Sequence, residues 1–324
     1  HMQGFKVNEF GGPEVMVWEE LEPLVPGEGQ VLVDVHASGV NFAETRMRAG
    51  TYSGQPLPFV MGMEGAGVVV AIGAGVTAFK PGDRVFGRAR GTHAEQVLFD
   101  EAHLMSLPDS LSFEEGAAIP VGWLTAWHAL HTVAEIAPRQ RVLVEAVGGS
   151  VGSAALQIAS QHGCWTAATA SLDNKLEPAS TFGADLLINY QRESISDRVA
   201  EATDSQGVDV SLMTIGSATS QQLLDSMGME GKVVMFGSTG GRDITFNLNI
   251  GVLNIQLLSM SISTSPRFET ETMASFRRHA LPRFADGSFK AVVDRVLPLA
   301  EVVKAHAMID DRKHYGKIIL KVER

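Results

Sequence analysis

Cysteine is nearly absent from this chain of 324 residues, in which Cys164 is the single example. A disulfide within the chain is therefore excluded, and so is a zinc site built from four cysteines. Scarce cysteine suits a reducing compartment. No signal-peptide pattern opens the chain, and His1-Met2 is typical of a cloning remnant. We therefore expect a cytoplasmic protein.

Basic clusters and long apolar runs are also missing. Lys and Arg total 26 against 37 Asp and Glu, which gives a net charge of −11. Such acidity without a basic block argues against nucleic-acid binding. The longest weakly charged run, residues 60–76, contains Glu64 and several glycines and is too interrupted to span a bilayer. We expect neither nucleic acid nor a membrane among the partners.

The residues that are present indicate two domains. Residues 4–125 are typical of short strands separated by Gly/Pro turns, as in the alternating segment 31–36. From residue 126 to 261, strands and helices alternate, which predicts a doubly wound parallel sheet. Residues 262–324 are too few for a large core of their own, so we expect them to complete the first region. The predicted class is α/β, with one domain from 1–125 and 262–324 and the other from 126–261.

The strongest local motif is a glycine turn between a predicted strand and a predicted helix. Gly149 lets backbone approach a pyrophosphate, Gly152 lets the helix pack closely, and the N–H groups at Ser150 and Val151 open the helix. A plain turn gives a similar pattern, and Val147 replaces the first glycine of G-x-G-x-x-G. Within the strand–helix alternation, the motif favours dinucleotide binding.

The next predicted strand distinguishes the two nicotinamide dinucleotides. NAD sites often carry an acid at its end to bond the ribose 2′-hydroxyl. Here Ser171 ends the strand, with Lys175 one helical turn later. Lys175 could equally be a solvated helix residue. We predict NADPH, with Ser171 and Lys175 near its 2′-phosphate.

Two glycine-rich turns in the first region carry polar side chains, at residues 38–44 and 62–67. Asn41 is the main candidate there for catalysis. An amide at such a position can also simply cap a turn.

These residues together resemble the zinc-free medium-chain reductases, a group that includes zeta-crystallin-like quinone oxidoreductases and polyketide enoyl reductases. The similarity covers nearly the whole chain. The landmarks are Ser38-Gly-Val-Asn-Phe42, Gly62-Met-Glu-Gly-Ala-Gly67, Pro81-Gly-Asp-Arg-Val85, the turn 149–152, Gly183-Ala-Asp185, Ile188-Asn-Tyr190 and Gly316-Lys317.

The resemblance implies a GroES-like catalytic domain from both ends of the chain and a Rossmann cofactor domain in the middle. It implies that Asn41 lies near the nicotinamide, and it adds further cofactor residues: Tyr190, Gly216, Phe236, Gly237 and Lys317. The chain departs from the family pattern at Glu44, Arg46, Glu145 and Ser150, which leaves the substrate open.

The resemblance also bears on metal. Zinc alcohol dehydrogenases of this superfamily have cysteine where Asn41 stands and histidine where Met63 stands. A catalytic zinc needs three protein ligands, and Cys164 falls in the other domain. We therefore expect no metal.

Without a metal to polarise a ketone, reduction of a conjugated C=C or a quinone is the simpler chemistry. It needs a held nicotinamide, a positioned acceptor and donors toward the developing oxyanion. Asn41 is the candidate donor, and Tyr52 is either a proton source or a packed aromatic side chain. One alternative is an enoyl reductase, or a cyclopropane-forming variant, acting on carrier-bound acyl thioesters. Another is a non-catalytic NADPH-binding protein.

One apolar segment, residues 254–262, predicts an edge strand of the cofactor sheet. An unpaired edge strand favours association. We expect a homodimer with twofold symmetry.

Overall fold

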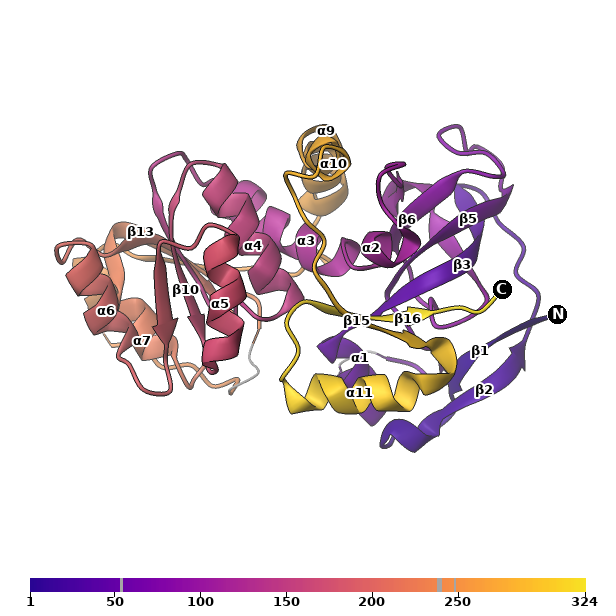
Figure 1. Ribbon diagram of the computed structural model, residues 1–324, viewed down its shortest axis with the longest axis horizontal. Helices are drawn as coiled ribbons and strands as arrows, with labels where there is room; N and C mark the ends of the chain where they lie inside the picture. Colours follow the sequence, from indigo (N-terminus) through magenta and orange to yellow (C-terminus); the bar gives the residue numbers. More distant parts are fainter. Residues whose placement is uncertain (53–54, 238–240, 248) are drawn as a thin grey trace. The chain divides into compact units, whose positions relative to one another are not determined.

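The computed structural model describes residues 1–52, 55–237, 241–247 and 249–324, which form two compact units (Figure 1). The terminal unit contains His1–Val121 and Ser275–Arg324, and the central unit contains Gly122–Ala274. The second boundary lies beyond the predicted 261/262. The reason is local: the Thr272 hydroxyl bonds His128 Nδ1 at 2.6 Å and the Thr132 hydroxyl at 2.7 Å, which ties this segment to the central unit.

The central unit contains a parallel sheet in the order β11-β10-β9-β12-β13-β14. Its strands are β9 (Arg141–Val144), β10 (Trp165–Ala170), β11 (Leu186–Asn189), β12 (Val208–Met213), β13 (Met227–Met235) and β14 (Gln256–Ser259). Its main helices are α4 (Ser150–Gln161), α5 (Asp173–Thr181), α6 (Ile195–Ala202), α7 (Ser220–Asp225) and α8 (Asn249–Val252). The doubly wound sheet predicted from the alternation is confirmed.

Alternating side chains along each strand pack on opposite faces of this sheet. Ala167 and Ile188 pack in one cluster with residues of α6 and α7, whereas Ala168 and Leu187, one position away, pack with α4 and α5. Successive strand side chains point to opposite faces, so a run of apolar residues is buried on both. In Figure 1, α6 and α7 lie side by side, and the backbone N–H of Ile195 donates to Gln222 Oε1 at 2.7 Å between them.

Some predicted elements differ from the structure. The predicted helix 125–137 is α3 (Pro120–Trp127) followed by a π-helical turn (His128–Val133). The predicted helix 270–285 is divided into a π-helical turn (Phe268–Met273), α9 (Ala274–His279) and α10 (Leu281–Ala285). Pro282 at the start of α10 lacks the N–H that a continuous helix would need.

The terminal unit is β-rich, as predicted. One sheet has the order β2-β1-β4, and a larger one the order β15-β16-β3-β5-β6-β8, with β7 also paired to β3. The strands are β1 (Met2–Val7), β2 (Met16–Leu21), β3 (Gln30–Val40), β4 (Phe59–Val60), β5 (Glu64–Ile72), β6 (Arg84–Arg88), β7 (Gln96–Asp100), β8 (Leu104–Ser106), β15 (Val293–Pro298) and β16 (Lys317–Lys321). Because β16 pairs antiparallel with β3, the last residues complete the sheet begun by the first, as expected.

The helices that lie wholly in the terminal unit are α1 (Phe42–Ala49), α2 (Phe113–Ala117), α10 and α11 (Val302–Asp311), with 3₁₀ turns at Pro13–Val15, Glu101–His103 and Leu299–Glu301. The sequence reading missed α1, which follows β3 directly. Asn41 is its N-cap residue, and the Glu44 carboxylate accepts the Asn41 backbone N–H at 2.7 Å. Among the described residues of either unit, no helix is both long and apolar enough to cross a membrane.

Candidate functional site

In the central unit, the predicted glycine turn joins β9 to α4. Gly149 is the N-cap residue of α4, and Ser150, Val151 and Gly152 form its first turn. A Cβ on Gly152 would lie 2.4 Å from the Ala146 carbonyl oxygen, so only glycine fits there. A helix of this length that opens at a glycine turn presents free N–H groups, which favour an anion.

The predicted phosphate contacts lie beside this turn. A Cβ on Gly148 would meet Lys175 Cδ at 2.5 Å, so the Lys175 side chain runs over the turn. Ser171 is half-buried just after the end of β10. The first acid of α5, Asp173, accepts from Asn189 Nδ2 at 3.0 Å and from Arg192 Nη1 at 2.6 Å. These two bonds lower the pKa of the Asp173 carboxyl and engage it with its neighbours.

The other predicted cofactor residues of this unit are distributed as follows. Gly216 follows β12 with φ +91, a conformation that glycine adopts without strain. A Cβ on Gly237 would lie 2.7 Å from the Thr214 carbonyl oxygen, so the ends of β12 and β13 approach closely there. The backbone N–H of Phe236 donates to Met213 at 3.2 Å. Tyr190, by contrast, packs its ring against the cluster under α6 and α7.

Glu145 connects the segments that follow β9 and β12. Its carboxylate accepts the backbone N–H of Thr214 at 3.1 Å and of Ile215 at 3.4 Å, and the Thr219 hydroxyl also donates to it. Burial raises the pKa of Glu145 to about 7, although these bonds oppose the shift. In sheets with this strand order, ligands bind where the strand sequence reverses, which here is between β9 and β12. Glu145 therefore fixes the backbone at the expected dinucleotide site.

The terminal unit contains a buried polar network. It consists of Ser38, Asn41, Glu44, Arg48, Glu64, His93, His306 and Lys317, all under 9% exposed. These residues come from β3, α1, β5, α11, β16 and the segment before β7.

Both the oxygen and the nitrogen of the Asn41 side-chain amide form hydrogen bonds within this network. Its Oδ1 accepts from Lys317 Nζ at 2.6 Å, and its Nδ2 donates to Glu44 at 3.0 Å and to Glu64 at 2.8 Å. Both amide hydrogens are thus engaged with carboxylates. The expectation that Asn41 donates directly to a substrate oxygen does not fit this geometry.

Lys317 also differs from expectation. Its ammonium lies 3.3 Å from Glu64 Oε2 as well as bonding Asn41, and the residue is only 2% exposed. Burial raises the pKa of Glu64, although Lys317 and Asn41 counteract this. Lys317 is therefore a partner of Asn41 and Glu64 inside the terminal unit.

The other half of the network surrounds Glu44. His93 Nε2 lies 2.8 Å from Glu44 Oε1, and His93 Nδ1 lies 2.7 Å from the Ser38 hydroxyl. Burial would raise the pKa of Glu44, but the attraction and hydrogen bond of His93 outweigh it and lower the pKa. Arg48 Nη1 lies 2.7 Å from His306 Nδ1, and burial lowers the pKa of His306 to about 4. No motif in the sequence marked His93 or His306.

Ligand atoms of Glu44, His93 and His306 lie within 4.8 Å of one another, a donor set that zinc can use. The hydrogen bonds argue against such a site. A guanidinium only donates, so Nδ1 of His306 accepts from Arg48 and the neutral ring carries its proton on Nε2. Metal-bound histidines show the reverse arrangement, with the second nitrogen donating. Nδ1 of His306 is thus arranged unlike that of a metal-bound histidine, and its Nε2 has no hydrogen-bond partner among the described residues.

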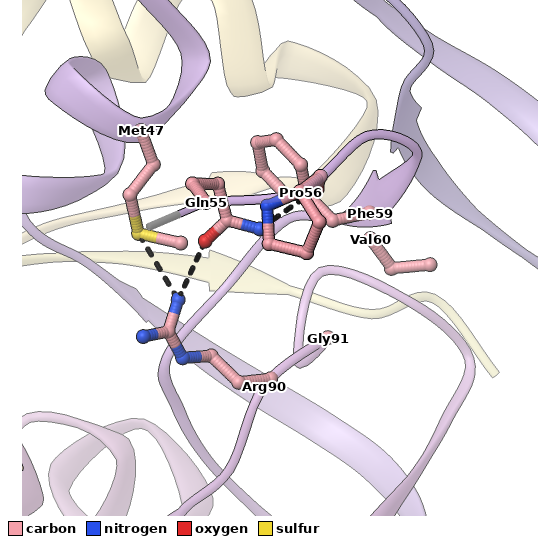
Figure 2. Close-up of a pocket in the computed structure, with 7 residues that line it drawn as sticks. All are labelled: Met47, Gln55, Pro56, Phe59, Val60, Arg90 and Gly91. Atoms are coloured by element: carbon pink, nitrogen blue, oxygen red, sulfur yellow. Dashed lines mark hydrogen bonds between the residues drawn. The ribbon is translucent and has the colours of Figure 1, made fainter. Parts of the chain in front are cut away.

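Beside α1 the terminal unit has a hollow of about 440 Å³ (Figure 2). It is lined by Met47, Gln55, Pro56, Phe59, Val60, Arg90 and Gly91. Tyr52 is half-buried just before the residues that lie outside the described part. Burial lowers the pKa of Arg88, and the Tyr52 phenol is among the groups that oppose this shift. No hydrogen bond between the described residues joins Tyr52 to Asn41.

Two family models match the chain. The alcohol dehydrogenase GroES-like domain matches residues 27–109, and the zinc-binding dehydrogenase family matches residues 150–278. The second name describes that family and assigns no metal ligand in this chain.

Several known proteins are similar over nearly their full length. A quinone oxidoreductase of Homo sapiens is 33% identical over 328 residues, covering 98% of this chain and 97% of that protein. A mycobacterial protein solved as a complex with NADPH is 30% identical with a TM-score of 0.90, covering 98% and 99% of the two chains. A structure described as an NAD-dependent alcohol dehydrogenase is also 30% identical, with a TM-score of 0.89 and coverage of 99% and 100%. The chain therefore belongs to the medium-chain dehydrogenase/reductase superfamily, as an oxidoreductase of its quinone oxidoreductase branch.

Proposed function

We propose that this protein transfers hydride from NADPH to a quinone or an activated C=C, without zinc. The observation that carries the proposal is the setting of Asn41. It occupies a zinc-ligand position of the related alcohol dehydrogenases, yet it is bonded to Lys317 and two carboxylates. An amide in that setting provides no Lewis acid. The acceptor must then delocalise the incoming charge itself, which quinones and enones do.

Bound NADPH supplies the hydride from C4 of its nicotinamide. The chain's own residues must hold the cofactor, hold the acceptor and admit a proton. We assign cofactor binding to the turn at Gly149 and to the backbone at Gly216. The hydrogen bonds of Glu145 to Thr214, Ile215 and Thr219 hold the backbone around this site. Asn41 serves as a positioning residue that fixes Lys317 and Glu64. Water, or the phenol of Tyr52, supplies the proton to the reduced acceptor.

Tyr52→Phe separates the two proton sources. It removes the hydroxyl and keeps the ring. If water supplies the proton, kcat should fall less than threefold. A loss of a hundredfold or more in kcat, with KM little changed, would assign the proton to Tyr52.

For the cofactor, Ser171 and the Lys175 side chain beside the glycine turn favour NADPH. The engagement of Asp173 with Asn189 and Arg192 adds support, since a carboxylate bonded in this way is less available to a ribose hydroxyl. Loss of one charge-assisted contact costs roughly 1.5–3 kcal/mol. Lys175→Ala should therefore weaken NADPH binding about ten- to a hundredfold and leave NADH nearly unchanged. Lys304→Ala, on α11 of the terminal unit, is the control. Equal losses for both cofactors would contradict the assignment.

We also propose a twofold-symmetric homodimer. Among the described strands, β14 pairs with β13 alone, at the edge of the sheet, and Leu257 on it is 37% exposed. Pairing of β14 with its copy would cover this edge. Light scattering should give twice the chain mass at micromolar concentration, and a monomer would contradict the proposal.

A panel of acceptors tests the reaction class. Free quinones and enones should be reduced by NADPH. Reduction confined to carrier-bound enoyl thioesters would favour a dedicated enoyl reductase. Tight NADPH binding with no acceptor reduced would favour a non-catalytic role.

A further inference from the structure

The hollow beside α1 combines an apolar wall with one guanidinium (Figure 2). The apolar side chains come from α1 and β4 and the segment before it: Met47, Pro56, Phe59 and Val60. Arg90 and Gly91 come from the connection between β6 and β7. A volume of about 440 Å³ is within the range of small-molecule sites.

Arg90 is held in place by uncharged partners. Its Nη1 donates to Gln55 Oε1 at 3.0 Å and contacts Met47 Sδ at 3.4 Å. Gln55 is itself fixed, because its Nε2 donates to the Pro56 carbonyl oxygen at 3.2 Å. Both contacts use Nη1, which leaves Nη2 and Nε of the guanidinium as donors. No carboxylate of the described residues forms an ion pair with Arg90.

A second guanidinium makes the local charge more positive. Arg88, the last residue of β6, is half-buried, and the charge of Arg90 adds to burial in lowering the pKa of Arg88. The Glu64 carboxylate acts in the opposite direction and raises the pKa of Arg88. Like charges at short range repel, and an anion bound between or beside them relieves that repulsion. The pocket therefore has the Arg90 guanidinium and an apolar surface formed by Met47, Pro56, Phe59 and Val60 among its lining.

We propose that this pocket is a subsite for an oxyanion, a carboxylate or sulfonate, attached to an aromatic or aliphatic body. Arg90 pairs with the oxyanion, and the apolar wall contacts the body. Arg90 is then a specificity-determining residue that selects acidic acceptors over neutral ones. This substrate class rests on the proposed hydride transfer, but the binding subsite does not.

Binding can be tested apart from catalysis with a matched pair of non-reducible probes. Naphthalene-2-sulfonate carries the charge, and naphthalene-2-sulfonamide has a similar shape without it. By calorimetry, the wild type should bind the sulfonate at least tenfold more tightly than the sulfonamide. Arg90→Gln should remove that difference, and Arg90→Lys, which keeps the charge, should retain most of it. Arg295→Gln changes an exposed arginine on β15 and should have no effect. Equal affinities for the two probes, or an unchanged preference in Arg90→Gln, would overturn the subsite.

Kinetics with NADPH then test the substrate class. Arg90→Gln should lower kcat/KM for 1,4-naphthoquinone-2-sulfonate about tenfold, mainly through KM, and change that for 1,4-naphthoquinone less than twofold. An equal effect on both quinones would overturn the specificity role. If the wild type reduces neither quinone, the proposed function fails, and the calorimetry alone decides whether the subsite exists.

Discussion

The two units bury ionisable groups in different ways. In the terminal unit, the buried Glu64 carboxylate lies 3.3 Å from the Lys317 ammonium, and the buried Glu44 carboxylate lies 2.8 Å from the His93 ring. In the central unit, Glu145 is buried with two backbone N–H groups and one hydroxyl as its partners. A cation beside a buried carboxylate opposes the rise in pKa that burial causes, as Lys317 does for Glu64, whereas neutral donors such as those of Glu145 oppose it less. The comparison predicts that removing a cation destabilises the terminal unit most, and that titration of His306 and of Glu145 changes stability with pH in opposite directions.

Removal of the Lys317 charge should give the largest effect. Lys317→Met keeps the length of the side chain but leaves Glu64 and the Asn41 carbonyl oxygen without their buried donor. Breaking a buried pair in this way costs about 3–5 kcal/mol. Urea unfolding should show the loss, and hydrogen exchange should place it in β5 and β16. The double variant Glu64→Gln/Lys317→Met should recover part of the stability. A single variant as stable as the wild type would show that the pair contributes nothing.

The pH dependence of the terminal unit should follow His306. Its pKa is about 4 in the folded chain, below the ordinary 6.5, so between these values the unfolded chain binds the additional proton. Stability then falls as pH drops from 6.5 to 4, by about 3 kcal/mol for a shift of this size. His306→Asn should remove this slope, although it also costs the bond with Arg48. His279→Asn, at an exposed position on α9, is the control. Opening free energies of the β16 amides that do not change with pH in the wild type, after correction for the intrinsic exchange rate at each pH, would contradict this assignment.

The stability of the central unit should change with pH in the opposite direction and by a slightly smaller amount. The Glu145 pKa of about 7 exceeds the ordinary 4.5, so here the folded chain retains the additional proton. Stability should fall as pH rises from 4.5 to 7, by up to about 3 kcal/mol, with the hydrogen bonds to Thr214 and Ile215 as the opposing influence. Glu145→Gln keeps an acceptor for both N–H groups and should abolish the slope. Glu201→Gln, an exposed change on α6, should leave it intact. The same sign of slope in both units would break the comparison.

Residues close together in the sequence made most of the fold predictable. Alternation of strand and helix identified the parallel sheet, and the turn from Gly149 to Gly152 marked the start of α4, where we propose that the dinucleotide binds. The sequence also contains a local signal for the start of α1. Asn41 with Glu44 three residues later has the spacing of a capping box. That pattern also explains why the side chain of Asn41 has its contacts inside the protein.

The buried polar network could not be found in this way. His93 and His306 are separated by more than 200 positions in the chain and meet only through the pairing of β16 with β3 and the packing of α11. A single sequence contains no information on such pairs. For the same reason, Lys317 was assigned to the cofactor from a two-residue landmark, whereas its partners Asn41 and Glu64 lie in distant segments.

The central claim is hydride transfer to an acceptor that can itself delocalise the incoming negative charge. NADPH deuterated at the transferring position of C4 tests it most directly, with an α,β-unsaturated ketone as acceptor. The account predicts deuterium on the β-carbon of a saturated ketone, with activity unaffected by chelators. Deuterium on the carbinol carbon of an allylic alcohol, with loss of activity on chelation, would contradict it and indicate a metal-dependent ketone reductase.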